Sequence, residues 1–292
     1  VVMDVVYNHT GASADSHLNL AVPDYYYRQN ADGGFSNGSG CGNETASDRS
    51  MVRKMIVDSV KYWAEEYHID GFRFDLMALH DITTMKEVRT TLNKIDDSIL
   101  VYGEGWTGDD SPLSSEDQAL KVNTTKYGDL QIAAFSDDMR DAIKGHVFED
   151  TTAGFINGFN GLEDVIKFSI VASTKNDQVE YTGGPDPFSG YGVTAWANEP
   201  YQTINYASAH DNLTLWDKLQ TTNPNATEEE LLAMNKMSAA LVLTSQGIPF
   251  FQAGEELART KLNADGSFNH NSYNAPDSVN KFDWTRKEDY ND

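Results

Sequence analysis

The sequence predicts an α/β fold in which short parallel strands alternate with helices, and three observations support this class. Short apolar runs of strand length recur along the chain, and segments with helical apolar spacing lie between them. Polar and titratable residues directly follow several of these runs, where the strands would end. The first run leads into Asn8-His9-Thr10-Gly11, which is not a glycine-rich phosphate-binding turn. The pattern therefore favours a (β/α)8 TIM barrel over an open, doubly wound nucleotide-binding sheet.

Six strands are expected from the apolar runs. The first comprises residues 1–6, and the second lies within 68–75, where apolar and charged residues alternate. Because a barrel of this class has about eight strands, we expect strands 3 to 8 to be present and the first two to be missing. Residues 1–292 would then form one incomplete barrel domain. The other four strands are predicted at 99–103, 132–135, 203–209 and 248–256.

Helices are expected where apolar residues recur every three to four positions. The segment 48–67 has this spacing and would deliver the chain to the second strand. The acids Glu228, Glu229 and Glu230 after Thr227 predict a helix start with negative charge in its first turn, which is a structural role. Further helices are predicted at 82–95, 139–144, 162–173 and 228–244, and a polar loop at 183–187.

The two ends of the sequence are abrupt for a barrel domain. Residues 1–6 already resemble a buried strand and lack an initiator methionine, while 286–292 is a charged segment with no packing element after it. We therefore expect a fragment that begins inside a domain, with material missing at both ends. An incomplete barrel would leave unpaired strand edges, so the isolated chain is expected to aggregate or to be poorly active.

Composition narrows the classes of partner. The 292 residues carry a net charge of −23, from 45 acidic and 22 basic residues, which disfavours nucleic acid and anionic membrane surfaces and suits a neutral polar substrate. No apolar run reaches the roughly 18 residues of a membrane span, and no signal segment opens the chain, so no compartment is assigned. The single cysteine, Cys41, excludes an intrachain disulfide and a cysteine-rich metal site.

The second predicted strand carries Arg73 and Asp75 two positions apart. A side-chain period of two places both on one face of the strand. An aspartate held ionised by a guanidinium could act as a nucleophile or stabilise a developing charge. A structural salt bridge at a strand end explains this stretch equally well.

Other strand ends add partners for such an aspartate. Glu104 follows the third predicted strand, and His210 and Asp211 follow the fifth. Carboxylates, histidines and an arginine that converge at one barrel mouth suit glycoside hydrolysis, in which one carboxylate attacks and another protonates the leaving oxygen. No His-x-x-x-His pairing is present, so a catalytic metal is not expected. The acidic loops leave room for a structural calcium ion, although no ligand spacing specifies one.

Four ordered segments resemble the motif regions of the α-amylase superfamily (glycoside hydrolase family 13), and two further stretches resemble type I pullulanases within it. The resemblance covers essentially the whole chain. The four motif segments are Asp4-Val5-Val6-Tyr7-Asn8-His9, Gly71-Phe72-Arg73-Phe74-Asp75, Tyr102-Gly103-Glu104-Gly105-Trp106 and Ala209-His210-Asp211-Asn212, and the two pullulanase-like stretches occupy residues 40–47 and 271–280.

This resemblance implies a role for each matching residue. Asp75 would be the nucleophile, Glu104 the general acid and base, and Asp211 would bind the distorted sugar and stabilise the transition state. Arg73 would orient Asp75, and retention of configuration follows if the carboxyl groups of Asp75 and Glu104 lie roughly 5–5.5 Å apart. The remaining candidates would support or bind the substrate: His9 and His210 by hydrogen bonds, Asp4 and Asn8 from the first strand, Asn212 beside Asp211, and Trp106 by stacking, although a buried core tryptophan is nearly as well supported for Trp106.

The implied activity is hydrolysis of α-1,6-glucosidic bonds in pullulan, limit dextrins and branched α-glucans, without a cofactor for catalysis. The nearer alternatives are an isoamylase-like or α-1,4-acting enzyme of the same superfamily. A non-catalytic glucan-binding relative is the alternative from another class, and the presence of all three carboxylates counts against it. Type I pullulanases also have a motif just upstream of the first of the four regions, and this sequence begins too late to show it. We do not expect their amino-terminal carbohydrate-binding domains and carboxyl-terminal β-domain within residues 1–292.

Overall fold

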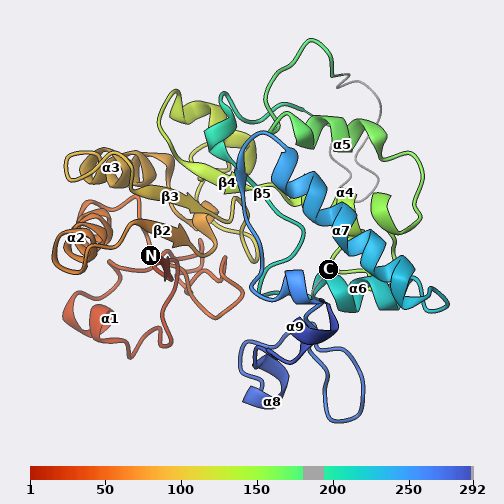
Figure 1. The fold of residues 1–292 in the computed structure, drawn as a ribbon. Helices are drawn as coiled ribbons and strands as arrows, with labels where there is room; N and C mark the ends of the chain where they lie inside the picture. Colours follow the sequence, from red (N-terminus) through yellow and green to blue (C-terminus); the bar gives the residue numbers. More distant parts are fainter. Residues whose placement is uncertain (180–193, 291–292) are drawn as a thin grey trace. The chain divides into compact units, whose positions relative to one another are not determined.

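The computed structural model describes residues 1–179 and 194–290, and the polar loop predicted at 183–187 lies outside them. The chain divides into two compact units (Figure 1). The first unit comprises 1–135 and 196–202, and the second comprises 136–195 and 203–292. The expectation of a single domain over 1–292 stays a prediction.

The first unit contains four parallel strands in the order β1-β2-β3-β4. Asp4 on β1 is the register partner of Arg73 on β2, which is in turn the register partner of Tyr102 on β3. The register therefore brings residues from three distant segments to one level of the sheet. The strand bounds are β1 Val2–Val5, β2 Gly71–Phe74, β3 Leu100–Gly103 and β4 Ala133–Phe135.

Two long helices pack together in the first unit, α2 (Ser50–Tyr67) and α3 (Ile82–Leu92) (Figure 1). Both agree with the predicted helical segments 48–67 and 82–95 to within three residues. Their apolar faces are buried, as are Phe72 and Phe74 on β2. Asp81 caps α3 by accepting a hydrogen bond from the Thr84 amide. Shorter elements of this unit are α1 His17–Ala21, η1 Met77–Leu79, η2 Lys121–Tyr127 and η4 Pro200–Gln202, none of which the apolar spacing predicted.

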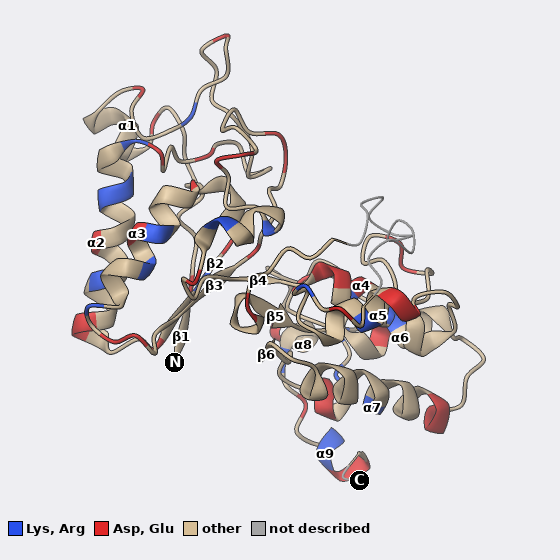
Figure 2. Cartoon of the chain, turned by 90° about the horizontal axis from the view of Figure 1, so that it is seen from above, with Lys and Arg blue, Asp and Glu red and all other residues tan. Residues whose placement is uncertain are grey.

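The second unit contains two parallel strands, six α-helices and two 3₁₀ helices among the residues that the structure describes. The longest helix, α7 (Glu228–Thr244), has the predicted bounds. Thr227 and Glu230 form a capping box, and the acidic first turn is marked in Figure 2. The remaining elements are β5 Thr203–Asn205, β6 Ile248–Pro249, α4 Asp137–Lys144, α5 Glu163–Ile170, α6 Leu215–Thr222, α8 Asp277–Asn280, α9 Arg286–Asp289, η3 Phe155–Asn157 and η5 Glu255–Leu257.

The last two strands are shorter than predicted. β5 ends at Asn205 instead of 209, and β6 comprises only two residues of the predicted 248–256. Pro249 has no N–H group to donate to a sheet, which limits the pairing of β6. Gly254 has a φ of +94°, and the chain enters the short helix η5 directly after it. Glu255 and Glu256, predicted at the tip of a strand, therefore lie in a 3₁₀ helix.

All of the pairings given above are parallel, so the chain is an α/β protein with six parallel strands among its described residues. This agrees with the predicted class, while closure into a (β/α)8 barrel stays a prediction. Acidic positions occur throughout both units, in keeping with the net charge of −23 (Figure 2). Among the described helices, none combines the length and apolar character that crossing a membrane requires.

Candidate active site

Arg73 is the centre of an ionic cluster at the carboxyl ends of β1, β2 and β3. Its Nη1 atom lies 2.8 Å from Asp4 Oδ1 and 2.9 Å from Asp75 Oδ1, and its Nη2 atom lies 2.6 Å from Glu104 Oε1. The side chains of Arg73 and Glu104 are each only 9% exposed, whereas Asp75 is 25% and Asp4 53% exposed. One guanidinium thus binds three carboxylates, and water reaches two of them more easily than the third.

The strand geometry explains why these residues meet. Arg73 faces Asp4 because the two are register partners across β1 and β2. The parallel ladder also continues one residue past the strands, since the Asp75 amide donates to the Val5 carbonyl and the Glu104 amide donates to the Phe74 carbonyl, both at 3.1 Å. These two hydrogen bonds fix the backbone from which both carboxylates project.

The charge balance of the cluster keeps Arg73 protonated. Burial lowers the pKa of Arg73, but the attraction of the Glu104 and Asp4 carboxylates raises it by more, so its pKa lies above the ordinary value. The arginine therefore presents a permanent positive charge to the carboxylates.

Both carboxylate oxygens of Asp75 have partners. Asn8 Nδ2 donates to Asp75 Oδ2 at 2.9 Å and to the Asp75 carbonyl at 2.8 Å, while Arg73 holds Oδ1. Because the Asn8 amide nitrogen faces Asp75, its oxygen faces His9, whose Nδ1 lies 2.6 Å away. An amide oxygen only accepts hydrogen bonds, so Nδ1 of His9 carries the proton. The neutral ring therefore has an acceptor at Nε2.

Glu104 is held by a charge on one oxygen and a backbone amide on the other. Arg73 binds Oε1, and the Leu76 amide donates to Oε2 at 2.8 Å. Leu76 has a φ of +38°, which is uncommon for a bulky residue. Leu76 directly follows Asp75, and its left-handed backbone conformation directs the Leu76 amide toward Glu104. Strain of this kind is found preferentially at functional sites.

The glycines on either side of Glu104 allow close backbone packing. A Cβ atom on Gly103 would lie 2.5 Å from the Phe74 carbonyl oxygen, and one on Gly105 would lie 2.6 Å from the Lys121 amide nitrogen. Only glycine fits such approaches without displacing the backbone. Trp106, next along the chain, is partly exposed and is therefore not a fully buried core residue.

The predicted residues of the second unit lie on the turn after β5. His210 and Asp211 are each 56% exposed in their side chains, with Nε2 and Oδ2 separated by 3.5 Å. Asn212 has a φ of +61°, which turns the chain, and asparagine tolerates this conformation better than most residues. The buried Lys261 donates from Nζ to the His210 carbonyl at 2.8 Å.

The structure therefore brings the sequence candidates together in two groups. In the first unit, Arg73 contacts three of the candidates directly and Asn8 links Asp75 to His9. In the second unit, His210, Asp211 and Asn212 are consecutive. Sequence reasoning missed Lys261, because a single lysine in a loop carries no periodic or motif signal. It also missed Asn43, whose contacts with the His9 segment depend on the folding of a long loop.

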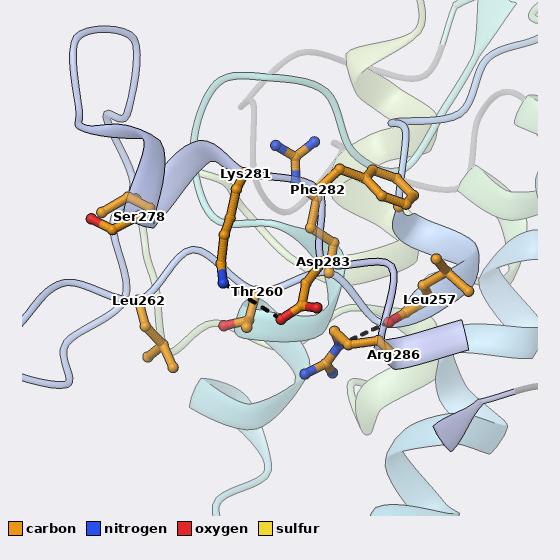
Figure 3. Close-up of a pocket in the computed structure, with 11 residues that line it drawn as sticks. Leu257, Thr260, Leu262, Ser278, Lys281, Phe282, Asp283 and Arg286 are labelled. Atoms are coloured by element: carbon orange, nitrogen blue, oxygen red, sulfur yellow. Dashed lines mark hydrogen bonds and ion pairs between the residues drawn. The ribbon is translucent and has the colours of Figure 1, made fainter. Parts of the chain in front are cut away.

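The second unit also contains a pocket lined by other residues (Figure 3). Leu257, Phe282 and Arg286 are among the side chains that line it, and Lys281 forms an ion pair with Asp283 at 3.8 Å. None of the predicted catalytic or substrate-binding residues lines this pocket. In residues 1–179 and 194–290, no group of three or more histidine, cysteine, aspartate or glutamate side chains is arranged to hold a metal ion.

Comparison with known proteins identifies the relatives of the chain. No protein-family model matches it. It is 37% identical to the pullulanase of Bacillus subtilis over 99% of its own length and 37% of that protein, and 33% identical to pullulanase 1, chloroplastic, of Arabidopsis thaliana over 98% of its length and 33% of that protein. The chain thus spans about a third of the length of these curated relatives.

A solved structure gives the same result. The crystal structure of the pullulanase from Paenibacillus barengoltzii in complex with maltohexaose and α-cyclodextrin matches with a TM-score of 0.88 and 44% identity. The match covers 99% of this chain and 42% of that one. Along nearly its whole length this chain is therefore homologous to pullulanases, which confirms the resemblance predicted from its motifs.

Proposed function

We propose that the protein containing this chain is a retaining glycoside hydrolase that cleaves α-1,6-glucosidic bonds in pullulan, limit dextrins and branched α-glucans. The observation that carries this proposal is the binding of Asp75 and Glu104 by one guanidinium at neighbouring strand ends. Its homology to pullulanases supports the substrate class, as does the maltohexaose complex of the Paenibacillus barengoltzii enzyme. No cofactor is needed for this chemistry.

In the proposed reaction, Asp75 attacks the anomeric carbon while Glu104 protonates the departing glycosidic oxygen. The Asp75–sugar ester forms as the bond between that carbon and the oxygen breaks. Glu104, now a carboxylate, then takes a proton from water, and this water releases the sugar from Asp75. Arg73 and Asn8 hold the two Asp75 oxygens, which aims the carboxylate for attack.

Arg73 also supports the second half of the reaction. It bonds Glu104 as well as Asp75, so it can stabilise the Glu104 carboxylate once the proton has left. Sharing one guanidinium keeps the two carboxyl groups close, in keeping with the roughly 5–5.5 Å of retaining enzymes. A separation well above ~6.5 Å in a substrate complex would contradict retention.

His9 would contact a sugar hydroxyl through Nε2. With its proton on Nδ1, neutral His9 would accept a hydrogen bond from the hydroxyl, and only the protonated ring would donate one. Trp106 is partly exposed and follows Glu104, which supports a stacking role beside the cleaved bond. Asp4 would contribute by fixing Arg73.

Asp211 and His210 would complete the site by binding the hydroxyls of the distorted sugar, with Asn212 shaping the turn. Their exposure, 56% for each of the first two side chains, leaves them accessible to substrate. This role requires the closed (β/α)8 arrangement, which we propose on the basis of the six parallel strands and the homology. A structural calcium ion stays a prediction without a specified ligand set.

Product analysis with the full-length protein tests the proposal. Pullulan should yield maltotriose, whereas panose or isopanose would indicate cleavage of α-1,4 bonds instead. Asp75→Asn should abolish turnover and leave glucan binding intact, and retained turnover would overturn the nucleophile assignment. Binding of malto-oligosaccharides by the wild type without any hydrolysis would identify a non-catalytic relative.

A further inference from the structure

The loop at residues 38–45, called the clasp loop below, contacts the backbone that carries His9. Asn43 on this loop is only 1% exposed. Its Oδ1 atom accepts a hydrogen bond from the Thr10 amide at 3.0 Å, and its Nδ2 atom donates to the Thr10 carbonyl at 2.8 Å. One side-chain amide thus satisfies both backbone groups of the residue after His9.

Two further hydrogen bonds extend this contact along the same segment. The Thr45 hydroxyl donates to the Tyr7 carbonyl at 2.6 Å, and the Thr45 amide donates to the Asn8 carbonyl at 2.8 Å. The clasp loop therefore holds the backbone on both sides of His9. Asn8 in turn orients Asp75 and His9 through its side chain.

The clasp loop is itself fixed to the segment after Glu104. The amides of Gly108 and Asp109 donate to the Gly38 carbonyl at 2.9 and 2.8 Å. A Cβ atom at position 108 would lie 2.4 Å from the Ser39 carbonyl oxygen, so the two backbones touch. The Ser39 hydroxyl donates to the Asn43 carbonyl at 2.5 Å, which fixes Asn43 within the loop.

We propose that Asn43 is a positioning residue that holds His9 in register with Asp75, so that the imidazole meets the sugar bound for cleavage. An asparagine suits this task because it presents a donor and an acceptor in the same plane, as a peptide group does. The inference rests on the proposed function, because it requires His9 to contact substrate. It gives the clasp loop the role of positioning His9, whereas the resemblance of this loop to pullulanases implied no role for it.

A double-mutant cycle in the full-length protein tests this inference. Asn43→Ala should lower kcat/KM on pullulan about 10- to 100-fold, with most of the loss in kcat, because a misplaced contact costs rate even when the fold remains. If Asn43 acts through His9, adding Asn43→Ala to His9→Ala should lower kcat/KM by less than about twofold. Asn30→Ala, an exposed asparagine of the same long connection, is the matched control and should leave kcat/KM unchanged.

Thermal melting of the same variants separates positioning from stability. Asn43→Ala should lower Tm equally in the presence and absence of His9, whereas its effect on kcat/KM should depend on His9. An equal loss of kcat/KM in both backgrounds would overturn the inference, as would a His9→Ala protein with wild-type kcat/KM. If Asn43→Ala does not fold, Asn43→Ser, whose hydroxyl can replace one of the two hydrogen bonds, is assayed by the same criteria.

Failure of the proposed function would be seen in the products released from pullulan, and not in the double-mutant cycle. Release of panose or isopanose from pullulan would contradict α-1,6 selectivity, while the cycle would still measure the coupling between Asn43 and His9 on the bond that is cleaved. Additivity in an enzyme that does release maltotriose would instead reject only the positioning role.

Discussion

Replacement of Arg73 by methionine should destabilise the carboxyl ends of β1, β2 and β3 and abolish activity on pullulan. Two unit charges about 4 Å apart interact by about 4 kcal/mol at an effective dielectric constant of 20. Arg73 and Glu104 are each 9% exposed, so water screens their pair little. Removing one partner from a buried pair typically costs about 3–5 kcal/mol, because the other charge stays buried without a partner. We expect a loss of this size near pH 7.

Hydrogen exchange is the suitable assay, since the full-length protein has more than one unit and need not unfold in a single step. Amides of 71–76 and 100–104 should exchange faster in Arg73→Met by the factor that about 3–5 kcal/mol implies. Arg73→Lys keeps the positive charge but cannot bind Asp75 and Glu104 through two separate nitrogen atoms. Compared with Arg73→Met, it should therefore recover stability more than activity.

The matched control is Lys54→Met, which removes an ion pair with Asp58 on the surface of α2. Both side chains of that pair are more than half exposed, so the loss should stay below about 1 kcal/mol. If the amides of 71–76 exchange equally slowly in wild type and in Arg73→Met at pH 7, the reasoning is refuted.

Three further predictions concern other parts of the chain. Gly105→Ala should displace Lys121 or the Glu104 segment and lower kcat at least tenfold, measured on pullulan. Burial raises the pKa of Glu255 from 4.5 to about 7. Its ionisation therefore destabilises the folded state as the pH rises from 4.5 to 7. Because glutamine cannot ionise, Glu255→Gln should become more stable relative to wild type across that window, by up to about 3 kcal/mol at pH 8. Thr227→Ala should cost about 1 kcal/mol through loss of the α7 cap, measured by denaturant unfolding of the second unit.

Each of these predictions has an outcome that contradicts it. Wild-type kcat in Gly105→Ala would show that the backbone there has room to move. A stability difference between Glu255→Gln and wild type that is constant from pH 4.5 to 8 would rule out the raised pKa. For Thr227, the control is Thr244→Ala at the other end of α7, whose hydroxyl bonds only within its own helix; an equal effect of the two substitutions would argue against the cap.

The sequence predicted elements best where a local signal was strong. The start of α7 followed from Thr227 and the acidic residues directly after it, a signal contained within four residues. The shared face of Arg73 and Asp75 followed from the period of a strand. The catalytic assignments of these residues and of Asp211 stay predictions, since they rest on resemblance and geometry without a bound substrate.

Features that depend on contacts between distant segments could not be predicted in this way. The pairing of Arg73 with Glu104 depends on the register of β2 against β3, which the sequence pattern does not specify. The short α6 was also missed, although α4 and α5, which have the same length of eight residues, were predicted. The premature ends of β5 and β6 also went unrecognised, because apolar residues continue after the hydrogen-bonded ladder stops.

The arrangement of charges around Arg73 also constrains the order of folding. Asp4 lies 69 residues before Arg73, and Glu104 lies well after it, so neither anion is a local neighbour of the arginine in the unfolded chain. A guanidinium is costly to bury before its counter-ions arrive. The interior of the sheet should therefore form only when β1 and β3 dock on β2 together. A half-assembled sheet is thereby disfavoured, and the arginine makes the docking of these three strands cooperative.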